Sequence, residues 1–74
     1  MEEKKIVYEI IISIWNIVKE YFFRKMSDEE IEIMWNKAEA EEKRFQQYGK
    51  EYNLLFRGIW SAFVQFYERK NCNG

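Results

Sequence analysis

The sequence IVYEIIISIWNIVKEYFF, which runs from Ile6 to Phe23, decides the fold, because no other segment is so apolar over so many consecutive residues. At 3.6 residues per helical turn, most of its polar positions fall on one narrow stripe, and apolar side chains take up most of the remaining circumference. The members of this stripe are Lys5, Glu9, Ser13, Asn16 and Glu20. A helix with so little polar surface is expected to lie between other elements. A buried strand over 10–14 is the alternative, because isoleucine also favours strands.

Composition and charge limit the kind of partner to expect. The chain has 74 residues, of which 47% are apolar and 19% aromatic, and this predicts one densely packed domain. Its formal net charge is −1, so neither nucleic acid nor an anionic membrane is an expected direct partner. Glu9, Lys19 and Glu20 interrupt the apolar run, so no membrane span is expected. With no secretory signal pattern and a single cysteine, Cys72, we expect a soluble cytoplasmic protein.

The sharpest local signal marks the start of a second helix. Ser27 and Glu30 have the spacing of a capping box, in which each side chain accepts a hydrogen bond from the other residue's backbone N–H. Met26 and Ile31 flank this pair at the spacing of a hydrophobic staple. Gly49 suits the position just after the end of the same helix, where a left-handed conformation is common.

These signals predict an all-α protein, because the sequence has no proline and only three glycines to break helices. The expected helices cover about 3–25, 28–48 and 51–70. They should form a three-helix bundle or a helical hairpin with a crossing third helix, in one domain over 1–70. A flexible polar tail is expected over 71–74.

The apolar arcs of the first and third helices are wider than one small bundle can cover. A single copy would therefore expose a large apolar patch, which monomeric proteins avoid. This predicts a homo-oligomer, a dimer in the first place. Gly58, inside the third helix, is expected to allow close approach to a neighbouring helix. The predicted self-association surface consists of Ile10, Ile14, Trp15, Ile17, Tyr21, Trp60 and Phe63.

The sequence offers little to catalysis. It has no histidine and no Gly-rich phosphate loop or nucleophile motif, so we expect a protein that is not an enzyme and has no cofactor. Glutamate pairs such as Glu29 with Glu32, or Glu39 with Glu42, are possible ligands for a hard cation. Carboxylate-bridged metal bundles add a Glu-x-x-His motif, which is missing, so no metal site is predicted.

Acidic residues are concentrated in the second helix, with seven acids and one lysine between Asp28 and Glu42. We interpret this helix as the surface for a protein partner. The predicted partner-binding residues are Glu32, Glu39, Glu41 and Glu42. Two alternatives remain open: a glutamate on the apolar side pairs with a lysine or arginine at the rim, or the acids imitate a phosphate backbone. The acids of the first turn are also explained by the helix dipole alone.

Aromatic residues leave another alternative, in which the protein is an oligomeric sponge for a signalling nucleotide. Tyr8, Tyr52 and Tyr67 are the best candidates to stack on a base, because each has a polar tip outside an apolar ring. A structural role in a phage or plasmid assembly is a third possibility.

Four segments resemble small helical accessory proteins of phages, prophages and mobile elements in Firmicutes. They are IWNIVKEY from Ile14, MSDEE from Met26, YGK from Tyr48, and an aromatic segment that includes Ala62, Phe63 and FYERK from Phe66. Proteins of this class are often inhibitors of host defence, including anti-CRISPR proteins, and act by binding. The resemblance implies a host protein as partner, such as a defence nuclease, and it transfers no site residues.

Overall fold

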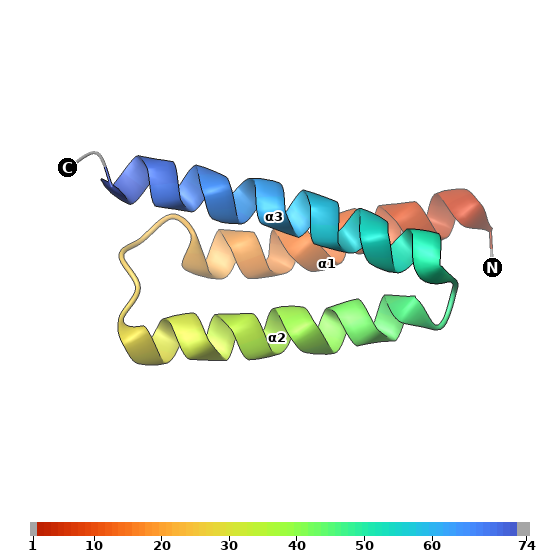
Figure 1. The fold of residues 1–74 in the computed structure, drawn as a ribbon, viewed down its shortest axis with the longest axis horizontal. Helices are drawn as coiled ribbons and strands as arrows, with labels where there is room; N and C mark the ends of the chain where they lie inside the picture. The colour runs from red at the N-terminus through yellow and green to blue at the C-terminus, as the bar shows by residue number, and fades with distance from the viewer. Residues whose placement is uncertain (1, 73–74) are drawn as a thin grey trace.

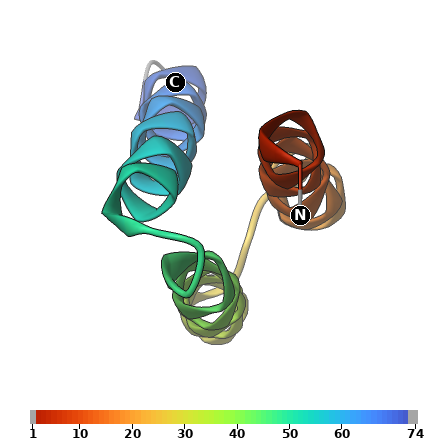
Figure 2. The ribbon, with the colours of Figure 1, turned by 90° about the vertical axis from the view of Figure 1, so that its right-hand side faces the viewer.

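The structure is a computed structural model that describes residues 2–72. Three helices follow one another along the chain: α1 (Glu3–Tyr21), α2 (Asp28–Gln46) and α3 (Lys50–Cys72). They run up, down and up, so α1 and α3 are parallel and α2 is antiparallel to both (Figure 1). Seen end-on, the three helices occupy the corners of a triangle, and each packs against the other two (Figure 2). The predicted all-α three-helix bundle is confirmed, and no strand occurs over residues 2–72.

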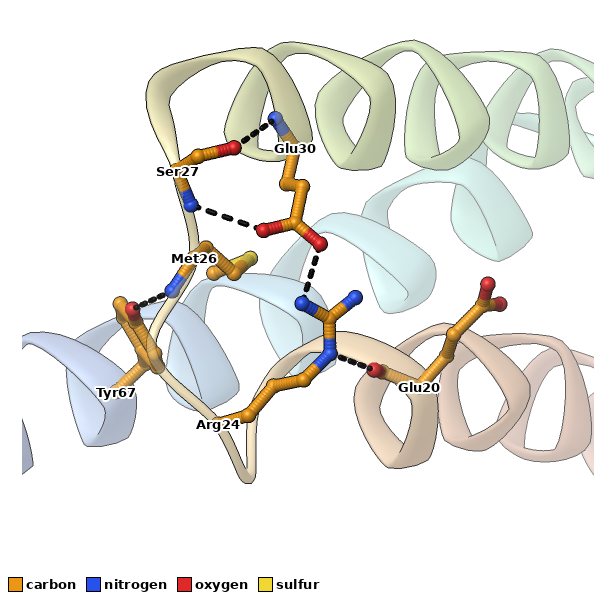
Figure 3. Close-up of polar contacts among 6 residues, drawn as sticks. All are labelled: Glu20, Arg24, Met26, Ser27, Glu30 and Tyr67. Atoms are coloured by element: carbon orange, nitrogen blue, oxygen red, sulfur yellow. Dashed lines mark hydrogen bonds and ion pairs between the residues drawn. The ribbon is translucent and has the colours of Figure 1, made fainter.

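The turn between α1 and α2 begins earlier than predicted. α1 ends at Tyr21 and does not reach Lys25. Arg24 accounts for this end, because its Nε donates to the carbonyl oxygen of Glu20, 3.1 Å away, in the last turn of α1. The guanidinium of Arg24 also pairs with the carboxylate of Glu30 in α2 (Figure 3). One side chain thus satisfies an unpaired carbonyl at a helix end and ties the two helices together.

The predicted capping box is confirmed at the start of α2. The backbone N–H of Glu30 donates to Ser27 Oγ over 3.2 Å, and the N–H of Ser27 donates to the Glu30 carboxylate over 3.0 Å. The hydrogen bond from Ser27, followed by that from Arg24, lowers the pKa of Glu30. Met26 is buried, and Ile31 packs against the same core, as expected of a staple. The Met26 N–H donates to the hydroxyl oxygen of Tyr67 over 3.4 Å, which brings α3 to this turn (Figure 3).

The second turn is shorter. α2 ends at Gln46, two residues before the predicted end, and α3 begins at Lys50. Gly49 between them has a φ of 134°, in a region that side chains rarely allow. The chain therefore reverses at the glycine that the sequence marked as the helix terminator.

α1 supplies more core residues than α2 or α3, although it is not enclosed by the other helices. Its buried face packs against α2 and α3, while Tyr8, Ile11 and Trp15 are exposed on its other side. Apolar side chains surround most of α1, as predicted, but α2 and α3 cover only part of this apolar surface. The apolar residues of the core are Ile6, Ile10, Ile14, Ile17, Val18, Tyr21, Phe22, Met26, Met34, Ala38, Phe45, Phe56 and Trp60.

α3 extends two residues beyond its predicted end at residue 70. The helix continues to Cys72, and the side-chain amide of Asn71 donates to the carbonyl oxygen of Tyr67 over 2.8 Å. Asn71 and Cys72 are therefore helical, which corrects the boundary at 70. Residues 73–74 of the predicted tail lie outside the described residues. Across residues 2–72, no helix has the length and apolar character needed to cross a membrane.

Candidate interaction surfaces

Most of the predicted self-association residues belong to the core of the single chain. Ile10, Ile14, Ile17, Tyr21 and Trp60 are each at most 5% exposed. They are therefore unavailable to a second copy, and this corrects their assignment. The periodicity of a helix shows which side chains share a face, but not which apolar face meets its own bundle.

The other two predicted self-association residues remain accessible. Trp15 is 45% exposed, and Phe63 is half-buried against the core. Trp15 meets the ring of Phe23 edge-on, with 6.2 Å between the ring centroids. This contact extends the exposed apolar surface of α1 toward the turn before α2.

Glu41, one of the predicted partner-binding residues, joins α2 to α1. Its carboxylate accepts a hydrogen bond from the buried hydroxyl of Ser13 over 2.7 Å. Arg44 lies one turn further along α2, with Nε 3.5 Å from the same carboxylate. Ser13, on the polar stripe of α1, therefore lies at a helix interface. This confirms the alternative in which a glutamate on the apolar side of the second helix pairs with a basic residue, because Arg44 lies beside the Glu41 carboxylate.

Glu42 has the corresponding role toward α3. The side-chain amide of Asn53 donates to its carboxylate over 3.1 Å, and Arg57 Nε lies 3.7 Å away. Both glutamates are half-buried, and each has a polar partner on a neighbouring helix. Glu41 and Glu42 therefore both help to hold α2 against its neighbouring helices.

Glu32 and Glu39, the other two predicted residues, are exposed on α2. They share one side of the helix with Asp28 and Trp35, because positions 28, 32, 35 and 39 recur at helical spacing. Trp35 is 44% exposed, and its ring meets the buried Trp60 edge-on at 5.7 Å. We call these four residues the acidic strip. No ion pair within residues 2–72 engages its three carboxylates.

Lys37, the one lysine of this acidic region, is held on a different side of α2. Its Nζ lies 5.2 Å from the centre of the Tyr21 ring and 3.6 Å from the Glu20 carboxylate, both on α1. A hydrogen-bonding contact with the Tyr21 hydroxyl, and then the charge of Glu20, raises the pKa of Lys37. Lys37 therefore balances the charge of Glu20 on α1 and does not neutralise the acidic strip.

An open apolar groove follows α3. Its volume is about 670 Å³, and its lining side chains are almost all apolar. Phe23 and Leu54 are more than half exposed, so they remain largely in contact with water. We call this the α3 groove; it is lined by Phe23, Leu54, Leu55, Gly58, Ile59, Ala62, Phe63 and Phe66.

Gly58 lines the groove and has open space where a side chain would be. Apart from its own stretch of helix, a Cβ atom at this position would have no atom within 4 Å in the described part of the chain. The close helix approach predicted at Gly58 therefore does not occur inside one bundle. The sequence did carry a signal for this surface, because Leu54, Gly58, Ala62 and Phe66 recur every four residues.

The tyrosines proposed for base stacking do not share one environment. Tyr8 is exposed, whereas the hydroxyl of Tyr67 accepts a backbone hydrogen bond at the α1–α2 turn. Tyr52 is half-buried near the start of α3, where burial, then Glu3 and Glu51, raises its pKa. Among the side chains that the structure describes, no group of three histidine, cysteine, aspartate or glutamate residues is placed to hold a metal ion.

Comparison with protein-family models, with curated proteins and with solved structures gives no match to this chain. The acidic strip and the α3 groove are therefore interpreted from their own geometry and charge.

Proposed function

We propose that this protein is a non-enzymatic accessory protein of the phage type, which binds a host protein and inhibits it. The acidic strip on α2 carries this proposal. It combines three carboxylates that have no basic partner in the described chain with a tryptophan held in place by Trp60. Tryptophan is enriched among the residues that dominate binding energy at protein interfaces.

The charge of the strip selects a basic surface as its target. Asp28 and Glu39 lie about 16 Å apart along α2, at 1.5 Å per residue. All three carboxylates would therefore be within reach of a single basic surface on a partner protein. A nuclease presents such a basic surface to the phosphates of nucleic acid. Occupation of that surface would exclude the nucleic acid, so we name a defence nuclease such as a CRISPR effector as the leading target. Inhibition would then take place in the cytoplasm of the bacterial host.

Self-association belongs to the same proposal. A dimer would present two acidic strips, and linked binding sites raise the overall affinity when both can be engaged at once. The exposed α3 groove supports this part, because monomeric proteins rarely leave large apolar patches in water.

Affinity capture from host lysate, followed by mass spectrometry, tests the proposal. The wild-type chain is expected to retain a nucleic-acid-binding host protein. The double variant Glu32→Lys/Glu39→Lys should lose it, because the variant places positive charge against a basic surface. The variant Glu2→Lys/Glu3→Lys, with the same change of net charge at the exposed start of α1, is the matched control and should still bind.

Two results would contradict the proposal. Retention of the same host protein by the Glu32→Lys/Glu39→Lys variant would remove the acidic strip from the mechanism. A thermal shift with cyclic nucleotides, together with no host protein captured, would favour the nucleotide sponge.

A further inference from the structure

The outward face of α3 has the pattern of a helix that pairs with a second helix. Along this face, residues recur at alternating intervals of four and three, as they do at a coiled-coil seam. Leu55, Gly58 and Ala62 line the α3 groove, and Gln65 and Arg69 line a hollow that continues it. We call this set the α3 seam; its members are Glu51, Leu55, Gly58, Ala62, Gln65 and Arg69.

The α3 seam is complementary to itself when it is reversed. Gly58 and Ala62 are equally far from position 60, and so are Leu54 and Phe66. The same holds for Glu51 and Arg69, which lie five helical turns apart and therefore on the same side of α3. In an antiparallel pair with a two-fold axis at position 60, small residues would face small ones. Leu54 would face Phe66 and Glu51 would face Arg69, whereas Leu55 would face Gln65.

Charge gives the pairing its direction. Within the α3 seam, Glu51 lies in the first turn of α3 and Arg69 lies in the last turn. The seam therefore has an acidic residue at one end and a basic residue at the other. A second copy in the antiparallel direction places unlike charges together, whereas a parallel copy would place like charges together.

Gly58 suits a close contact of this kind with a second copy. A glycine in the interior of a helix weakens that helix, and no neighbour within the described residues needs the space above it. Opposite Ala62 of a second copy, the missing side chain would let the two helix axes approach closely. Leu54 and Phe66 could then overlap with their counterparts instead of remaining in water.

We infer that two copies of this chain associate through antiparallel α3 helices, which cross near position 60 with Glu51 of each copy facing Arg69 of the other. Phe23 and, through its ring contact, Trp15 flank the pairing on the α1 side. The inference rests on the self-association part of the proposed function and gives it a surface. The seam is about 27 Å long and one helix wide, so it buries less than the roughly 800 Å² per partner of a standard interface. The dimer is therefore reversible.

A charge swap on the full chain tests the pairing, with sedimentation velocity over a range of concentrations as the measurement. Wild type is expected to dimerise as its concentration rises. Either Glu51→Arg or Arg69→Glu alone should raise the dissociation constant about tenfold, because the two-fold axis turns two attractive contacts into two repulsive ones. The double variant Glu51→Arg/Arg69→Glu should return close to wild type. Glu68→Arg, exposed on the same helix outside the groove, is the control and should dimerise normally.

A second variant tests the contact at the centre. Gly58→Gln should abolish the dimer while the monomer remains folded, because its side chain has open space in one copy and none between two. Circular dichroism would verify the fold. A chain that stays monomeric at every concentration would overturn the inference and leave the groove to a helix from another protein. A double variant as weak as the single ones would overturn the antiparallel register.

The two proposals can fail separately. Glu32→Lys/Glu39→Lys lies on α2 and should leave the dimer intact even where it abolishes capture of the host protein. Gly58→Gln removes the dimer without altering the acidic strip. A monomeric wild type that still captures its target would refute the pairing alone.

Discussion

α1 and α3 are both rich in apolar residues, yet they have different roles. α1 has 19 residues and supplies seven buried ones, whereas α3 has 23 residues and, of its described side chains, only Phe56 and Trp60 are buried. The difference arises from the arrangement of the three helices. α1 turns its isoleucines toward both neighbours, whereas α3 turns a face of Leu54, Gly58 and Phe66 outward. Apolar composition therefore identifies buried surface only after the neighbours of a helix are known.

The largest difference in stability is expected between truncation of a buried residue of α1 and truncation of an exposed residue of α3. Ile14→Ala should lower the free energy of unfolding by about 2–5 kcal/mol, because it leaves a cavity among fully packed side chains. Leu54→Ala removes a side chain that is 53% exposed and should cost about 0.5 kcal/mol or less in the monomer. Urea denaturation at low protein concentration measures both values. Equal losses would mean that α3 is as much a part of the core as α1.

A smaller effect of opposite sign is expected at Gly58. Gly58→Ala should raise the free energy of unfolding of the monomer by about 0.5–1 kcal/mol, because alanine is the better helix former. The added Cβ finds no atom to displace in the described chain. Ala38→Gly is the counterpart in the core of α2 and should destabilise by more than this amount, since it loses both helix propensity and a buried methyl group. A loss of stability in Gly58→Ala would indicate an intramolecular neighbour at that position.

The smallest effect is expected at the turn between α1 and α2, where the Glu30 carboxylate accepts hydrogen bonds from Ser27 and Arg24. The pKa of Glu30 is lowered from its ordinary value of 4.5, first by the Ser27 N–H and then by Arg24. The carboxylate therefore stabilises the fold fully above pH 4.5, and this contribution is lost as the pH falls through the lowered pKa. The difference in unfolding free energy between wild type and Glu30→Gln should shrink across that window in urea titrations. A difference that stays constant from about pH 6 to about pH 3 would contradict this role.

The local features of the fold could be predicted from the sequence because their partners are close in the chain. Ser27 and Glu30 are three residues apart and form their reciprocal hydrogen bonds wherever the helix packs. Gly49 has the positive φ that a glycine between two helices suggests. The end of α1 was less predictable, because it depends on a contact of Arg24 with Glu30 of the next helix.

The candidate site was predicted in part. Glu32 and Glu39 are exposed as expected, whereas Glu41 and Glu42 hold α2 to its neighbours through Ser13 and Asn53. These contacts join residues 28 and 11 positions apart in the chain, and helical periodicity within one element carries no information about them. Trp35 was missed as part of the surface, because its spacing with core residues resembles that of a buried side chain.

The sequence by itself determined that the chain forms three helices, where the second one begins and which residues share each helical face. These properties follow from backbone hydrogen bonding and from interactions over one or two turns. Only the tertiary structure decided which apolar face became the core and which remained open along α3. That choice depends on how three helices divide a limited contact area among themselves, and each helix can offer more apolar surface than two neighbours can cover.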